Sequence, residues 1–269
     1  MKRIMTFLTV SVLLVSCSRN AITGRKQLTL YPESEITAAA EQQYRQFLST
    51  NKVVSPSADR DAEMVRRVGQ RVATAITQYY TQKGLGDQIK GYQWEYNLVD
   101  SKEVNAWCMP GGKIVVYTGL LPITQNEAAL AVVVGHEVTH AVAKHGNERL
   151  SQGMLQQLGG VALSAALASQ PAETQNLLMA AYGAGSEVGI LLPYSRNQEY
   201  EADKFGLYYT ALAGYNPQEA IPLWQRMEAA SQGSSKPPEF LSTHPAEGNR
   251  IKRLQENMPE ALKLYKPMR

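Results

Sequence analysis

Two histidines and a glutamate at fixed spacing are the residues of this sequence best suited to chemistry. The stretch 132–146, V-V-V-G-H-E-V-T-H-A-V-A-K-H-G, holds three of the four histidines in the chain. On a helix, positions i and i+4 share one face, so His136 and His140 can direct both rings at one metal ion. Glu137 lies about 100° around the helix from His136, beside the two rings. Its carboxylate can take a proton from a metal-bound water, which predicts a hydrolytic zinc site.

A catalytic zinc site has three protein ligands and one open position, so a third ligand must be found. His145 follows His140 by five residues, which places it about 140° away around a continuous helix and excludes it as a ligand. We expect His145 in the last turn of the helix, where its charge suits the helix dipole. The third ligand must therefore come from another element.

The segment 195–206, S-R-N-Q-E-Y-E-A-D-K-F-G, offers two carboxylates on one helix face. Glu199 and Asp203 are four residues apart, so both can face the same site. One carboxylate can bind the metal, and the other can accept the free ring N–H of a ligating histidine. Glu201 lies about 200° from each of them and is expected on a solvated face.

Helical periodicity dominates the elements that must position these residues. Apolar spacing predicts helices over 33–48, 57–82, 127–144, 150–169, 176–191, 198–213, 217–230 and 246–257. Residues 92–99 form a predicted strand, and two short strands around Pro110-Gly111-Gly112 form a predicted hairpin. The helix over 150–169 is expected to pack on the site, because glutamines and glycines interrupt its apolar run. The pattern predicts an α+β domain, mostly helical with one small sheet.

The net charge is +3, and no basic run is longer than a pair, which argues against nucleic acid as a partner. Residues 1–16 read as a signal peptide, with a basic start and an apolar stretch too short to span a bilayer. Cys17 then follows at the position of a lipidated cysteine, although an ordinary signal peptide containing a cysteine is the alternative. We expect a lipidated, extended tether over 17–32, a folded domain over 33–269, and a buried, inert Cys108.

Several motifs together resemble peptidase family M48. They are Asn105-Ala106 with Pro110-Gly111-Gly112, Gly135-His136-Glu137 with His140, Ser195-Arg196 with Glu199 and Asp203, Ser242-Thr243-His244-Pro245 with Arg250, and Thr23-Gly24-Arg25-Lys26-Gln27-Leu28. The resemblance implies a zincin-like metallopeptidase domain whose edge strand borders the active site. It makes His136, His140 and Glu199 the ligands of one Zn²⁺, Glu137 the general base and Asp203 the partner of a ligating ring.

The same resemblance assigns the segment beginning at Asn105, Ala106 and Trp107 to substrate binding by backbone pairing. Three roles are open for His244: a structural residue, a resting-state fourth zinc ligand, or an oxyanion stabiliser acting with Arg250 or Tyr194. We favour a functional role and place His244 and Arg250 among the catalytic candidates, without choosing between the last two roles.

The implied function is a zinc-dependent metalloendopeptidase that cleaves unfolded or damaged cell-envelope proteins. The signal peptide with Cys17 predicts a location in the bacterial envelope, facing the periplasm and anchored by lipid, and Ser18 after the cysteine favours the outer membrane over the inner. A chaperone or assembly factor that only binds unfolded chains is the alternative, and a hydrolase of small peptides is a further rival. The intact Glu137 favours an enzyme, because binding alone needs no base.

Overall fold

The computed structural model describes residues 17–168, 194–232, 238–244 and 249–267. It is a mostly helical α+β domain with a small main sheet, as predicted, and a separate two-stranded sheet near the N-terminus. The predicted signal peptide and the predicted helix over 176–191 lie outside the described residues. The helices are α2 (Glu33–Thr50), α3 (Arg60–Gln82), α4 (Leu121–Thr124), α5 (Glu127–Val142), α6 (His145–Leu167), α8 (Arg196–Leu212), α9 (Ala220–Ser231), α10 (Glu239–Thr243) and α11 (Arg250–Leu264), with short 3₁₀ turns η1 (Gly86–Ile89), η2 (Thr118–Leu120) and η3 (Pro217–Glu219).

The main sheet has four strands in the order β3-β4-β6-β5, so that β5 forms one edge. Its strands are β3 (Val53–Val54), β4 (Glu95–Val99), β5 (Ala106–Met109) and β6 (Lys113–Tyr117). Strand β5 pairs antiparallel with β6 through the predicted hairpin, whose Gly111 and Gly112 take φ values of 87° and 86°. Only glycine adopts this region readily, which explains the pair at the turn.

Helices cover both faces of this sheet. Tyr44 and Phe47 of α2 pack against Trp107 on one face. On the other face α3 and α5 contribute to the main hydrophobic core, which includes Val68, Ile114 and Leu130. Helix α5 is buried from Ala129 to Val142, and the Asn126 side chain caps its start by accepting the Ala129 N–H. A helix buried all round is rigid support for any side chain it carries.

Helices α5 and α8 cross at a pair of glycines. A Cβ atom added to Gly135 would lie 2.8 Å from the Gly206 carbonyl oxygen, and one added to Gly206 would lie 2.9 Å from the His136 nitrogen. The two backbones therefore come closer than any side chain would permit. This crossing brings the carboxylates of α8 beside the histidines of α5.

The N-terminal segment differs from the extended tether that we expected over residues 17–32. Strands β1 (Cys17–Arg19) and β2 (Lys26–Leu28) form an antiparallel hairpin. The Asn20 and Gln27 side chains donate hydrogen bonds to the Ala143 carbonyl oxygen at 2.7 and 3.1 Å. Tertiary hydrogen bonds hold this polar segment against the domain, and the periodicity of the sequence does not predict them. Lipidation of Cys17 stays a prediction.

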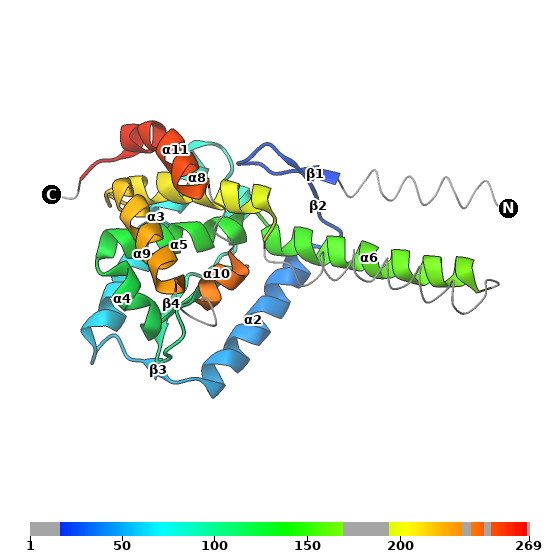
Figure 1. Cartoon of the computed structure of the whole chain (residues 1–269), viewed down its shortest axis with the longest axis horizontal. Coiled ribbons are helices and arrows are strands. Elements are labelled where there is room, and N and C mark those ends of the chain that lie inside the picture. Colours follow the sequence, from blue (N-terminus) through cyan, green and yellow to red (C-terminus); the bar gives the residue numbers. More distant parts are fainter. Residues whose placement is uncertain (1–16, 169–193, 233–237, 245–248, 268–269) are drawn as a thin grey trace.

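Helix α6 begins at His145, a residue that we expected in the last turn of the preceding helix. Lys144 takes φ 59°, a left-handed conformation that turns the chain between the two helices. The helix was expected to pack on the site, but it projects from the domain (Figure 1), and Leu158 and Val161 are 53% and 69% exposed. Among the described residues, no helix is long and apolar enough to cross a membrane.

Candidate metal centre

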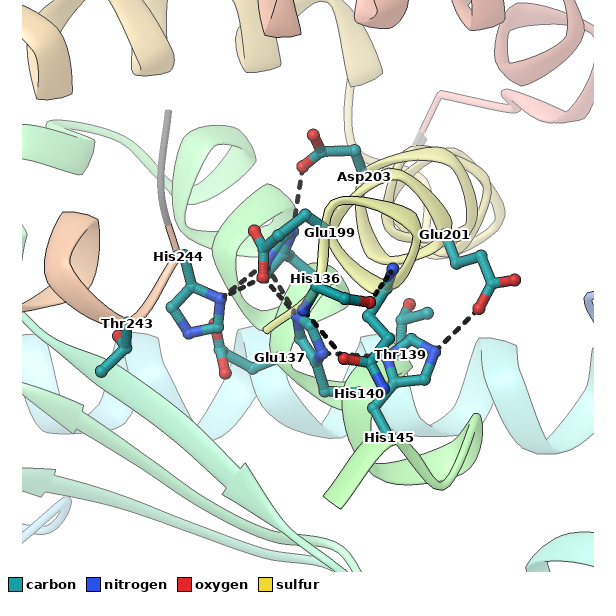
Figure 2. Close-up of polar contacts among 12 residues, drawn as sticks. His136, Glu137, Thr139, His140, His145, Glu199, Glu201, Asp203, Thr243 and His244 are labelled. Atoms are coloured by element: carbon teal, nitrogen blue, oxygen red, sulfur yellow. Dashed lines mark hydrogen bonds and ion pairs between the residues drawn. The ribbon is translucent and has the colours of Figure 1, made fainter. Parts of the chain in front are cut away.

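The two histidines of α5 and the first carboxylate of α8 meet at one point (Figure 2). The Nε2 atoms of His136 and His140 lie 3.1 Å apart. Glu199 places Oε2 3.5 Å from His136 Nε2 and Oε1 3.3 Å from His140 Nε2. A tetrahedral zinc ion with bonds of about 2.0–2.1 Å holds its ligand atoms about 3.3–3.4 Å apart. The three side chains therefore already have the spacing of a zinc site.

The protonation of these rings also fits a cation. His136 Nδ1 lies 3.0 Å from Asp203 Oδ1, so a ring proton on Nδ1 has an acceptor in the tautomer that leaves a lone pair on Nε2 for a metal. Burial holds the pKa of the His140 imidazole well below its usual value, which keeps this ring neutral. Burial alone would raise the pKa of Glu199, but the surrounding His136, His140 and His244 outweigh it and hold that pKa well below normal. Lone pairs and a carboxylate that converge in this way are a donor set for Zn²⁺.

Glu137 lies beside this donor set and is 3% exposed. Its Oε1 atom is buried, lies 3.4 Å from His244 Nε2, and accepts no hydrogen bond from the described residues. Burial raises the pKa of the Glu137 carboxyl, and the nearby His244 and His136 lower it only in part. A carboxylate whose pKa is raised towards neutrality is a better proton acceptor for catalysis near neutral pH.

His244 joins the cluster from the end of α10, far along the chain from the other three. Its Nδ1 atom lies 2.9 Å from Glu199 Oε1 and 3.2 Å from His136 Nε2, and the residue is 3% exposed. Burial alone would lower the pKa of His244, but the Glu137 and Glu199 carboxylates outweigh it and raise that pKa. His136, His140, Glu199 and His244 together form a group able to hold a metal ion.

Asp203 and Arg250 lie behind His136. Arg250 Nη2 donates to Asp203 Oδ1 at 2.6 Å and lies 3.2 Å from Glu199 Oε2. The guanidinium also lies 3.4 Å from the ring centroid of Trp224, a cation–π contact. Helical spacing suggested that one carboxylate of α8 would contact a ligating histidine, and Asp203 does contact the His136 ring. The structure brings Arg250 to the carboxylates of Glu199 and Asp203.

His145 and Glu201 have surroundings that the helical wheel did not predict. His145 is fully buried, and its Nδ1 atom lies 2.9 Å from His140 Nδ1 (Figure 2). Its Nε2 atom lies 2.9 Å from Glu201 Oε2, and Glu201 is 8% exposed rather than solvated. The expectation failed because α5 ends at Val142, so an angle measured on a continuous helix does not apply to His145. His145 remains outside the metal-binding group.

The predicted substrate strand lies at the sheet edge. Ala106 and Cys108 are buried on the α5 side of β5, and Cys108 is a free thiol, as expected. The Trp107 side chain instead packs under α2 and is therefore turned away from the metal centre.

Tyr194 stacks on His140 at 3.7 Å between ring centroids and an interplanar angle of 28°.

A helix with H-E-x-x-H crossed by a second helix with a carboxylate ligand defines a class of metallopeptidases. The chain belongs to peptidase family M48, whose family model matches residues 59–258. This confirms the resemblance drawn from the motifs and supports zinc as the metal of the site.

Relatives of the chain are named as metalloendopeptidases or proteases. The chain is similar to the mitochondrial metalloendopeptidase OMA1 of Schizosaccharomyces pombe, at 36% identity over 63% of this chain and 48% of that protein. It is 37% identical to the mitochondrial OMA1 of Bos taurus, over 65% of this chain and 34% of that protein. It is 29% identical to the beta-barrel assembly-enhancing protease of Escherichia coli K12, over 65% of this chain and 37% of that protein. The chain thus spans half or less of each.

The predicted location is wrong. We expected a lipid-anchored protein of the bacterial envelope, facing the periplasm. The OMA1 relatives, at 36% and 37% identity, are mitochondrial by name, whereas the bacterial assembly-enhancing protease matches at 29%. The motifs that carried the resemblance describe the catalytic fold, which relatives in different compartments share. They hold no information about where the chain works. The location was predicted instead from the short apolar leader and Cys17, a local pattern that carries far less information than the family match.

Proposed function

We propose that this chain is a zinc-dependent endopeptidase that hydrolyses peptide bonds of unfolded or damaged proteins. The convergence of His136, His140 and Glu199 around one point, with the buried Glu137 beside it, carries the proposal. Membership of a peptidase family supports a protein substrate. A role in protein quality control follows from the extended shape that an edge strand requires of its substrate.

In this proposal His136, His140 and Glu199 hold one Zn²⁺, which supplies a Lewis acid for the scissile carbonyl and a lowered pKa for water. Glu137 takes the proton of the attacking water and later gives it to the leaving amine. Its raised pKa suits both transfers, as does its Oε1 atom, which accepts no hydrogen bond within the described part of the chain. Asp203 accepts the Nδ1–H of His136 and fixes that ring.

His244 and Arg250 take different parts. His244 faces Glu137 with Nε2 and Glu199 with Nδ1, so it can stabilise a developing oxyanion or bind the metal at rest. Arg250 neutralises Asp203 and Glu199 from behind, which makes it a positioning residue rather than a group that touches substrate.

The substrate backbone pairs with the free edge of β5 in this account. Because β5 contributes Ala106 and Cys108 to the core beside α5, a strand added at this edge runs past the metal centre. Trp107 acts through its backbone only, since its ring is held by α2. Asn105 directly precedes the edge strand, and its side chain accepts the Ala106 N–H at 2.9 Å.

A binding protein that assists assembly without cleavage is the alternative. It keeps the edge strand but leaves Glu137 without a task. Casein digestion by the wild type and by Glu137→Gln, each with and without a chelator, separates the two. We expect chelator-sensitive cleavage by the wild type and a loss of about 10²–10⁴-fold in Glu137→Gln with zinc retained. Suppressed aggregation of casein with no cleavage by the zinc-loaded wild type would support the binding protein instead.

A further inference from the structure

The second zinc ligand of α5 is backed by a chain of polar contacts that no part of the proposed reaction uses. His140 Nδ1 lies 2.9 Å from His145 Nδ1, and His145 Nε2 lies 2.9 Å from Glu201 Oε2. Arg25 continues the chain, with Nε 2.7 Å from Glu201 Oε1. His145 and Glu201 are both buried, at 0% and 8% exposed. Polar groups buried at this depth need their partners.

Metal binding by His140 fixes the direction of every hydrogen bond in this series of side chains. If His140 Nε2 faces the metal, its ring proton is on Nδ1, which must then donate to His145 Nδ1. His145 therefore carries its own proton on Nε2 and donates it to Glu201. A histidine that accepts on one side and donates on the other transmits the orientation of Glu201 to the ligand ring.

Arg25 fixes the far end of the chain from outside the two helices. Its Nη1 and Nη2 atoms each donate to one oxygen of Glu148 at 2.7 Å, a bidentate pair, while Nε binds Glu201. Glu148 lies on α6, one turn after His145, and also accepts from Gln198 at the start of α8. One guanidinium thus joins α6, α8 and the N-terminal hairpin in a planar geometry that lysine cannot reproduce.

We infer that His145, Glu201 and Arg25 are positioning residues that together fix the ring of His140 for metal binding. The inference rests on the proposed role of His140 as a zinc ligand. It gives a task to the T-G-R motif at 23–25, which the reaction itself leaves unexplained and which precedes the family match over 59–258. The N-terminal hairpin is then part of the metal site's support.

Zinc affinity measured by competition with a chromophoric chelator tests this without relying on catalysis. All variants are made in the full chain with Glu137→Gln, so that turnover plays no part. We expect His145→Leu to weaken zinc binding by about 10–100-fold, the usual effect of losing a partner of a ligand. His145→Asn should recover most of the affinity, because its amide oxygen can accept the His140 proton in place of Nδ1. Arg25→Ala should lose about tenfold, the lower end of the same range.

The visible spectrum of the cobalt-substituted protein adds a readout that general stability does not move. We expect altered absorption bands in His145→Leu and Arg25→Ala, and bands like those of the wild type in His145→Asn. Arg45→Ala is the matched control. Arg45 also bridges two glutamates, Glu41 and Glu95, but it is 53% exposed on the face of the domain that α2 covers. It should keep both the zinc affinity and the cobalt spectrum.

Glu201→Gln and Glu201→Ala keep the test decisive if His145→Leu does not fold. The glutamine retains an acceptor for His145 and should bind zinc more tightly than the alanine variant. Wild-type affinity and spectrum in His145→Leu, or in both Glu201→Ala and Arg25→Ala, would overturn the inference, as would an equal loss in Arg45→Ala. Glu199→Ala separates this failure from that of the proposed function. If it binds zinc as tightly as its parent, then the metal site itself is wrongly assigned.

Discussion

The two histidine ligands of α5 are supported in different ways. His136 reaches a carboxylate directly, and Arg250 anchors that carboxylate, Asp203, from α11. His140 reaches a carboxylate only through a second ring, and Arg25 anchors that carboxylate from the N-terminal hairpin. Both arrangements run from ring to acid to guanidinium.

The difference lies in where each support comes from. The direct support is built within residues 59–258, the part that the family model matches, whereas the indirect one recruits a segment before it. The direct support also lends its guanidinium to the ligand Glu199, so one arginine serves two of the metal-binding side chains. We therefore expect the direct support to contribute more to zinc binding than the indirect one.

Glu199→Ala should have the largest effect on zinc affinity and should remove the difference between the two supports. Without the third ligand we expect zinc affinity to fall by more than about 100-fold, beyond the range for partners of ligands. Adding Asp203→Ala or Glu201→Ala should then change the affinity little, because each support acts only through a formed site. Isothermal titration with zinc would measure this, and a large further loss in either double variant would contradict it.

Asp203→Ala should weaken zinc binding by about 10–100-fold and exceed the effect of Glu201→Ala. The reason is that it both frees the His136 ring and leaves Arg250 with one carboxylate fewer. Chelator competition on the two variants side by side gives the ranking. A greater loss in Glu201→Ala would reverse our view of which support matters more.

Gly206→Ala should disturb both supports at once, since its Cβ would lie 2.9 Å from the His136 nitrogen where α5 and α8 cross. We expect about 1–3 kcal/mol of destabilisation from overpacking, measured by urea unfolding of the metal-free protein. Gly153→Ala on α6 is the matched control, because nothing lies within 4 Å of the added Cβ. It should gain about 0.5–1 kcal/mol. Similar losses of unfolding free energy in both variants would show that the close crossing of α5 and α8 has no special importance for stability.

Tyr194 should have the smallest effect, because it touches the metal-binding rings of His140 and His244 only by stacking. Its ring stacks on the His140 imidazole, so Tyr194→Ala should weaken zinc binding by about twofold to tenfold, the equivalent of an aromatic pair. Tyr194→Phe keeps the ring and should bind zinc as the wild type does. A fall in kcat with unchanged zinc affinity in Tyr194→Phe would assign the hydroxyl to the oxyanion.

Spacing alone predicted the half of the site that lies on regular helix. His136, Glu137 and His140 follow from i, i+4 geometry, because they lie within one unbroken helix. The same geometry made Glu199 and Asp203 a candidate pair on a second helix, and the family resemblance then assigned the metal to Glu199. The hairpin turn followed from its glycines in the same way. Local rules suffice where the backbone is regular.

The rest depended on places where regularity stops. Lys144 turns the chain at φ 59°, so His145 returns to His140 although a continuous helix would carry it away. His244 comes from the end of a short helix, and Arg25 from a hairpin with no periodic pattern. Glu201 does point away from Glu199, as the wheel indicates, but another side chain lies there instead of solvent. Tertiary contacts of this kind leave no trace in residue spacing.

Anomalous diffraction at the zinc edge, from crystals of the zinc-loaded protein, tests the central claim most directly. The account predicts one strong zinc peak bonded to His136 Nε2, His140 Nε2 and the Glu199 carboxylate, with His145 hydrogen-bonded to His140 and not to the metal. A peak elsewhere in the chain, no peak, or zinc bonded to His145 would contradict it.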